Sequence, residues 1–216
     1  MKGSVRRHVA IKQIEPAAES PPRALHPDHD PEDSSSDPAE GRPMVRTIGH
    51  GTRTIDELAA LLSSAGVATL IDVRRYPMGR RQPHLSRERL AIDLPERGLA
   101  YEWWGEALGG RRPVAGAMVS GSGWRQPAFA AYSAYMSSPV FHDALAELER
   151  RARAGEALAV MCAESVWWRC HRRLIADALM LDGLDVEHLI DRVPGRRHRP
   201  SGLGLTQHPG IRGPRA

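Results

Sequence analysis

The chain of 216 residues lacks two features of exported or membrane proteins. It has no run of about 18 apolar residues, the length that a membrane-spanning helix needs. Its N-terminus has no apolar stretch of the kind found in secretory signals. It also has only two cysteines, Cys162 and Cys170. We therefore expect a cytoplasmic protein that makes no membrane contact and whose cysteines are free thiols.

Motifs for common cofactors are also missing. Neither a P-loop nor the glycine pattern of dinucleotide-binding proteins occurs in the chain. The spacing of Cys162, Cys170 and His171 matches no standard zinc framework. The sequence thus predicts no metal site, and it leaves the cofactor unknown.

The net charge of +4 is unevenly distributed. Residues 1–43 contain six Lys or Arg against eight Asp or Glu, and the stretch from residue 16 to 43 is rich in Pro, Ser, Asp and Glu. Such a composition cannot bury enough apolar surface to fold, so we expect residues 1–43 to be a disordered tail. Residues 192–216 contain six Arg and no acid, and we expect a basic, irregular tail there. That tail could contact nucleic acid or simply be solvated.

Between these tails, residues 44–191 alternate between strand-like and helix-like segments. Thr54 and Glu57 form a capping box, and Ser86 and Ser138 are suitable caps for two further helices. Such alternation predicts a three-layer, Rossmann-like α/β domain whose mostly parallel, five-stranded sheet has helices on both faces. The expected strands are 45–49, 67–73, 99–104, 157–162 and 186–190.

Reactive and charged residues follow several of these strands. Because ligands of parallel sheets bind at the carboxyl ends of the strands, we expect a polar crevice there. Candidates for proton transfer or catalysis are His50, Asp72, Glu164, Cys162, Cys170 and His171. Candidates for binding an anion or other ligand are Arg74, Arg80, Arg172, Gly49, Gly51, Gly109 and Gly110.

The segment from residue 161 to 172 concentrates this chemistry, because a strand leads into a helix through a loop with both thiols. A helix N-terminus favours anions and lowers the pKa of a nearby thiol. Cys162 or Cys170 could thus be a nucleophile, Glu164 a general base and His171 a proton carrier. Two alternatives stay open: metal binding by these residue types despite their non-standard spacing, or a ligand site in which the thiols are structural.

The ordered motifs of the chain resemble a bacterial and archaeal family, domain of unknown function 488. The resemblance covers about residues 45–198 and rests on Thr47-Ile-Gly-His-Gly-Thr-Arg53, Ile71-Asp-Val-Arg74, Leu108-Gly-Gly110, Gly123-Trp124, Met161-Cys-Ala-Glu164 and Trp168-Arg-Cys-His-Arg172. It implies an α/β domain with a shared polar site and no particular reaction. Asp72-Val-Arg74 and the cysteine loop are also similar to rhodanese-type sulfurtransferases, although the loop from Cys162 to Arg169 is one residue longer.

Three hypotheses of function follow. In the first, the domain binds or acts on a phosphate-bearing ligand, a nucleotide or nucleic acid, through Arg74, Arg80 and Arg172. In the second, it is a thiol-dependent enzyme of sulfurtransferase-like or redox type that uses Cys162 or Cys170. In the third, it is a non-enzymatic module that interacts with nucleic acid. The sequence does not decide whether the protein is an enzyme, nor its oligomeric state.

Overall fold

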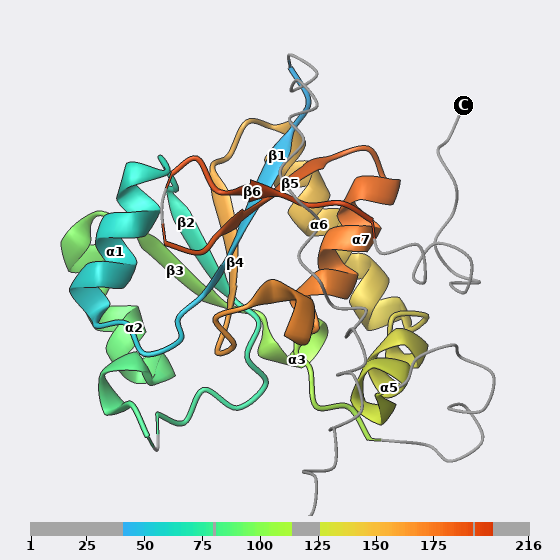
Figure 1. Cartoon of the computed structure of the whole chain (residues 1–216), viewed down its shortest axis with the longest axis horizontal. Helices are drawn as coiled ribbons and strands as arrows, with labels where there is room; N and C mark the ends of the chain where they lie inside the picture. Colours follow the sequence, from blue (N-terminus) through green and yellow to red (C-terminus); the bar gives the residue numbers. More distant parts are fainter. Residues whose placement is uncertain (1–40, 80, 114–125, 192, 201–216) are drawn as a thin grey trace, which may run out of the picture. The chain divides into compact units, whose positions relative to one another are not determined.

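A computed structural model gives the fold and describes residues 41–79, 81–113, 126–191 and 193–200 (Figure 1). Within these ranges, no helix combines the length and apolar character needed to cross a membrane. Arg80, residues 1–40 of the predicted N-terminal tail and residues 201–216 of the basic tail lie outside the described residues.

The described strands form one six-stranded sheet in the order β3-β2-β4-β1-β5-β6. The pairs among the first five strands are parallel, whereas β6 runs antiparallel to β5. This confirms the predicted α/β class and the mostly parallel sheet. The strand bounds are β1 Met44–Gly49, β2 Thr69–Asp72, β3 Ala100–Trp103, β4 Leu158–Cys162, β5 Asp185–Leu189 and β6 Arg196–Arg197.

The sixth strand corrects the sequence-based expectation of five strands and of an irregular segment after residue 191. Strand β6 pairs with β5 through His188 and Arg196, and the next residue, His198, is only 4% exposed. The N–H of His198 donates to the carbonyl of Val186 at 2.8 Å. A strand of two arginines at a sheet edge has no hydrophobic periodicity, so pattern analysis could not identify it.

Three of the six described α-helices begin where their capping residues predict. The capping box of Thr54 and Glu57 is confirmed at the start of α1, and the side chains of Ser86 and Ser138 cap α2 and α6. Three 3-10 turns occupy Pro83–Leu85, Pro95–Arg97 and Trp167–Arg169. The helix bounds are α1 Ile55–Ser64, α2 Arg87–Asp93, α3 Gly105–Leu108, α5 Pro127–Tyr135, α6 Pro139–Arg153 and α7 Arg172–Leu181.

Two hydrophobic cores flank the sheet and make three layers. Helices α1 and α2 place Leu58 and Leu90 in one core. Helices α5, α6 and α7 place Tyr132, Phe141 and Leu174 in the other. Figure 1 shows these two groups of helices on either side of the sheet. Both faces of the central strands are therefore covered, as continuous apolar strands require.

The chain reverses its direction of winding between β1 and β4, which are neighbours in the sheet. It leaves β1 through α1 toward β2, and it leaves β4 through α7 toward β5 on the other side. The two connecting helices pack on opposite faces. In open α/β sheets, the carboxyl ends of strands at such a reversal form the usual ligand crevice.

Candidate functional site

The loops that follow β1 and β4 lie side by side at this reversal. The N–H of His50 donates to the carbonyl of Cys162 at 3.0 Å, and the N–H of Gly51 donates to the carbonyl of Ala163 at 3.1 Å. The Gly-His-Gly turn and the cysteine loop therefore meet at one edge of the sheet, as expected for parallel strands.

Gly49 and Gly51 permit this close approach of the two loops. A Cβ atom at Gly49 would lie 1.8 Å from the carbonyl oxygen of Glu164, and one at Gly51 would lie 2.2 Å from Oγ of Ser165. Gly51 also has a φ of +55°, which glycine adopts more readily than other residues. The missing side chains thus serve loop packing, and ligand binding by either glycine stays a prediction.

The two cysteines of the chain are in direct contact. Cys162 ends β4 and Cys170 precedes α7, and their Sγ atoms lie 2.6 Å apart. Both are free thiols and are buried. Seven residues of loop and 3-10 turn separate them in the chain, so the pair forms because the loop folds back on the start of α7.

Arg172, the first residue of α7, is 1% exposed and binds the cysteine loop. Its Nε donates to Sγ of Cys162 at 3.0 Å, its Nη1 to Oγ1 of Thr47 at 3.2 Å and its Nη2 to the carbonyl of Glu164 at 2.6 Å. Among the described residues, no carboxylate forms an ion pair with this guanidinium. Because a buried cation is costly without a negative partner, Arg172 favours a thiolate at the adjacent pair.

The electrostatics of the two thiols differ accordingly. Burial alone would raise the pKa of Cys170, but the hydrogen bond from Cys162 and the charge of Arg172 lower it to about 7. Burial and the hydrogen bond to Cys170 raise the pKa of Cys162. Hydrogen-bonded thiols lose their protons in two separate steps, so the pair carries a single negative charge above about pH 7.

His171 lies beside Cys170 at the start of α7. Its Nδ1 is 3.4 Å from Sγ of Cys170, and its ring centroid is 5.0 Å from that of Tyr132. Burial lowers the pKa of His171, which keeps the imidazole neutral and able to accept a proton. Gly110 packs against this ring, since a Cβ atom there would lie 2.8 Å from Nδ1 of His171.

A pocket of about 490 Å³ opens beside the thiols, and both Cys162 and Cys170 line it. This volume is sufficient for a small organic molecule. The pocket walls also carry a histidine, two aromatic rings and two exposed arginines: His171, Phe129, Tyr132, Arg111 and Arg169.

Asp72, predicted as a catalytic residue, and Arg74, predicted as an anion-binding residue, pair with each other. Nη2 and Nε of Arg74 lie 2.6 and 2.9 Å from the two oxygens of Asp72. Tyr101 Oη donates to the same carboxylate at 2.8 Å, and Nη1 of Arg74 donates to the carbonyl of Leu85 at 2.8 Å. The Asp72 side chain is fully buried and that of Arg74 is 9% exposed, so this pair is closed to large ligands.

His50 lies at the edge of the Asp72–Arg74 pair. Its Nε2 is 3.1 Å from Nη1 of Arg74, and its Nδ1 is 3.0 Å from the carbonyl oxygen of Gly51. Because a guanidinium only donates and a carbonyl only accepts, the neutral ring carries its proton on Nδ1. Burial and the charge of Arg74 lower the pKa of His50 to about 4. The ring is thus neutral at physiological pH.

The thiols and the Asp72–Arg74 pair lie on opposite faces of the sheet. Side chains alternate along a strand, so Cys162 shares a face with Val160, which packs under α5, α6 and α7. By the same alternation, Asp72 shares a face with Leu70, which packs under α1 and α2. The expected single crevice thus consists of two neighbouring clusters, a thiol cluster and a carboxylate–arginine cluster.

Other predicted site residues contribute no side chain to the thiol pair or to the Asp72–Arg74 pair. Glu164 has an exposed side chain and reaches the thiol cluster through its backbone carbonyl. The carbonyl of Gly109 accepts a hydrogen bond from Nε of Arg112 at 2.8 Å. Within the described ranges, no three His, Cys, Asp or Glu side chains gather as they would around a metal ion. The catalytic and binding roles given to these residues stay predictions.

Sequence reasoning missed several polar residues that contact these clusters or are connected to them by hydrogen bonds. Thr47 lies on the same face of β1 as Val45, and strand alternation could have placed it beside the thiols. Asp177 is 1% exposed on the apolar side of α7. A single acid among apolar residues on a helix indicates a buried polar contact, so the sequence could have identified it. His198 follows the unpredicted strand β6, and no sequence pattern around it indicates that its side chain is buried.

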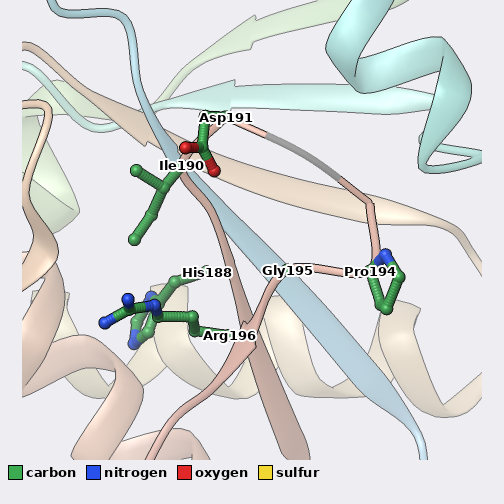
Figure 2. Close-up of a pocket in the computed structure, with 6 residues that line it drawn as sticks. All are labelled: His188, Ile190, Asp191, Pro194, Gly195 and Arg196. Atoms are coloured by element: carbon green, nitrogen blue, oxygen red, sulfur yellow. The ribbon is translucent and has the colours of Figure 1, made fainter. Parts of the chain in front are cut away.

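A second pocket, of about 200 Å³, lies beside β5 and β6. Figure 2 shows the side chains of His188 and Arg196 extending in the same direction from neighbouring strands. Neither thiol lines this pocket. Its lining residues are His188, Ile190, Asp191, Pro194, Gly195 and Arg196.

Comparison with known proteins identifies the family of the chain. No curated protein and no solved structure matches it. Residues 54–179 match the family model described as domain of unknown function DUF488. The matched range is more than half of the chain and contains the Asp72–Arg74 pair, both cysteines and Arg172. The chain therefore belongs to the DUF488 family, whose description assigns no function.

Proposed function

We propose that this protein is a thiol-dependent redox enzyme that exchanges its Cys162–Cys170 dithiol with a disulfide in a small organic substrate. One observation carries the proposal: two free thiols in contact at 2.6 Å line a pocket and face a buried arginine. A lowered pKa of Cys170 makes it the nucleophile. Cys162, with its raised pKa, is the second thiol.

The exchange proceeds in two balanced steps. The Cys170 thiolate attacks one sulfur of the substrate disulfide, the substrate S–S bond breaks, and the released half leaves as a thiolate that takes up a proton. The Cys162 thiol then loses its proton and attacks Sγ of Cys170, which releases the second half as a thiol. The protein pair becomes a disulfide, and two electrons pass to the substrate. A thiol reductant reverses the change in the protein.

The surrounding residues suit these steps. Arg172 stabilises the thiolate, and its buried position keeps water from weakening that attraction. Neutral His171 lies 3.4 Å from Cys170 and can carry the proton between the thiols and the leaving group. Thiol–disulfide exchange also requires reduced cysteines, which agrees with the expected cytoplasmic location.

The phosphate-ligand hypothesis has less support from the geometry. Arg74 is held by Asp72, and Arg172 is held by the cysteine loop and Thr47. The arginines at the pocket wall, Arg111 and Arg169, are the ones that could meet an anionic group of a substrate. Binding of a nucleotide or nucleic acid, by the domain or by the basic tail, stays a prediction.

Reaction of the reduced protein with the aromatic disulfide 5,5′-dithiobis(2-nitrobenzoate) tests the proposed function. Because the chain has only two cysteines, each product is unambiguous. We expect rapid release of two thionitrobenzoate ions per chain and a protein whose intact mass shows an internal disulfide without a bound adduct. Cys162→Ser should release one ion and keep a stable mixed disulfide on Cys170.

The matched Cys170→Ser variant should react slowly, since Cys162 alone lacks the lowered pKa. Equal and slow reaction of both thiols in the wild-type protein would overturn the proposal. Retention of two stable adducts would also overturn it, because a functional dithiol resolves the first adduct. A Cys162→Ser protein that accepts and donates persulfide sulfur as fast as the wild type would favour the sulfurtransferase-like alternative instead.

A further inference from the structure

A chain of hydrogen bonds leads from α7 across β5 to Arg172. Nε2 of His198 lies 2.8 Å from Oδ1 of Asp177, and Nδ1 of His198 lies 2.9 Å from Nε2 of His188. Nδ1 of His188 lies 2.7 Å from Oγ1 of Thr47, which is 3.2 Å from Nη1 of Arg172. We call the first four residues, Asp177, His198, His188 and Thr47, the buried relay.

The buried relay is enclosed by protein. All four of its residues are at most 4% exposed. The ring of Trp167 stacks on His188 at 4.2 Å and meets His198 edge to face at 5.0 Å. Burial, together with the charge of Arg172, holds the pKa of His188 well below its ordinary value. His188 is therefore a neutral ring, which donates through one nitrogen and accepts through the other.

When both rings are neutral, the carboxylate at one end sets the direction of every bond in the relay. A carboxylate only accepts, so His198 donates its Nε2–H to Asp177 and accepts at Nδ1. His188 then donates its Nε2–H to His198 and accepts at Nδ1. The hydroxyl proton of Thr47 consequently points to His188, which leaves its oxygen lone pairs for Arg172.

We propose that the buried relay fixes the hydroxyl of Thr47 as an acceptor and thereby positions Arg172 against Cys162, which makes the four residues positioning residues for the thiol pair. The proposal rests on the proposed thiol chemistry and extends it to residues that touch neither thiol. Without the relay, the Thr47 hydroxyl is free to rotate its proton toward the guanidinium. A proton aimed at Arg172 would push the guanidinium away from its place beside the sulfur.

The unpredicted strand β6 completes this arrangement, since it carries the chain to His198. Gly195 allows the β5–β6 connection to pass close to His188, because a Cβ atom there would lie 2.4 Å from the carbonyl oxygen of that residue. Figure 2 shows this connection beside His188. The C-terminal segment after β5 thus supplies one half of the histidine pair.

Nitrogen-15 NMR of histidine-labelled wild-type protein at pH 8 tests the direction of the relay without any substitution. We expect His188 and His198 both to carry a proton on Nε2 and none on Nδ1. Signals would be assigned with His188→Gln and His198→Gln. A proton on Nδ1 of either ring would reverse or interrupt the relay and overturn the proposal.

Two substitutions at the fully buried Thr47 separate positioning from simple packing. Thr47→Val keeps the shape but removes the hydroxyl, whereas Thr47→Ser keeps the hydroxyl and loses a methyl group. The readout is the pH dependence of Cys170 alkylation by iodoacetamide, whose wild-type midpoint we expect at about 7. Thr47→Val should raise the midpoint by about one pH unit and slow the reaction at pH 7 about fivefold. Thr47→Ser should keep the wild-type midpoint.

A second test of the relay is Asp177→Asn. Its control is Asp93→Asn, because Asp93 is another buried acid but lies outside the relay. Asp177→Asn should raise the alkylation midpoint, and Asp93→Asn should leave it unchanged. A wild-type midpoint at about 7 that none of these variants moves would overturn the relay alone. A wild-type midpoint near the ordinary thiol value of about 8.5 would overturn the proposed function and, with it, the relay.

Discussion

Two buried arginines lie at the same edge of the sheet, on opposite faces, and differ in what balances their charge. Arg74 is paired with the carboxylate of Asp72 at 2.6 Å. Arg172 instead contacts a sulfur, a hydroxyl and a backbone carbonyl. Both side chains are almost inaccessible to solvent, so the identity of the partner decides the chemistry of each.

The comparison separates a structural ion pair from the site that we propose to be reactive. The carboxylate of Asp72 is a strong and permanent negative partner of Arg74, so the charge of this arginine is balanced without a ligand. The thiols beside Arg172 become negative only when one of them loses a proton, so the charge of Arg172 favours the reactive form of Cys170. In the proposed function, the buried cation that has no carboxylate partner among the described residues marks the site of the chemistry.

The largest expected effect concerns stability and belongs to the carboxylate–arginine cluster. Asp72→Asn leaves Arg74 buried without a negative partner, which should lower the free energy of unfolding by about 3–5 kcal/mol. Urea unfolding followed by circular dichroism measures this change. The alkylation midpoint of Cys170 should stay at the wild-type value, because the thiols lie on the other face. A small loss of stability together with a shifted midpoint would contradict the separation of the two clusters.

The pH dependence of stability provides the next largest effect. His50 takes up a proton near its ordinary pKa of 6.5 in the unfolded chain but only near 4 in the folded protein. Between these values the unfolded chain binds more protons, so stability falls as the pH drops from 6.5 to 4 and this loss then ends. The loss should reach up to about 3 kcal/mol.

His50→Gln isolates this contribution, since glutamine can accept the hydrogen bond from Arg74 but does not titrate. Chemical unfolding at several pH values between 7 and 4 should show a shallower decline for the variant than for the wild type. The two curves would run parallel if protonation of His50 did not oppose folding.

The sequence predicted the thiol cluster better than the carboxylate–arginine cluster. Cys170, His171 and Arg172 are consecutive, and the loop from Cys162 leads directly to them, so local structure alone brings them together. Asp72 and Arg74 were predicted for catalysis and for anion binding, whereas the structure pairs them with each other. Their separation from the thiols depends on which helices cover which face, and strand patterns alone do not determine that.

Long-range polar contacts were the least predictable part of the site. Tyr101 and Thr47 lie on strands, where alternation gives a face but not the partner across the sheet. His198 required strand β6, whose two arginines have no apolar pattern to detect. These residues are identified only when packing brings distant segments together.

The smallest of the three effects tests the reactive arginine itself. Arg172→Met fills nearly the same volume but removes the charge that stabilises the thiolate, so the pKa of Cys170 should rise from about 7 toward the ordinary thiol value. Alkylation by iodoacetamide at pH 7 should then slow by about tenfold or more. Arg172→Lys retains the charge but carries its three donors on one nitrogen, which cannot span the acceptors that three guanidinium nitrogens reach, and it should give an intermediate rate. Equal rates for the wild type and Arg172→Met, both shown to be folded, would mean that the buried guanidinium does not control the thiols.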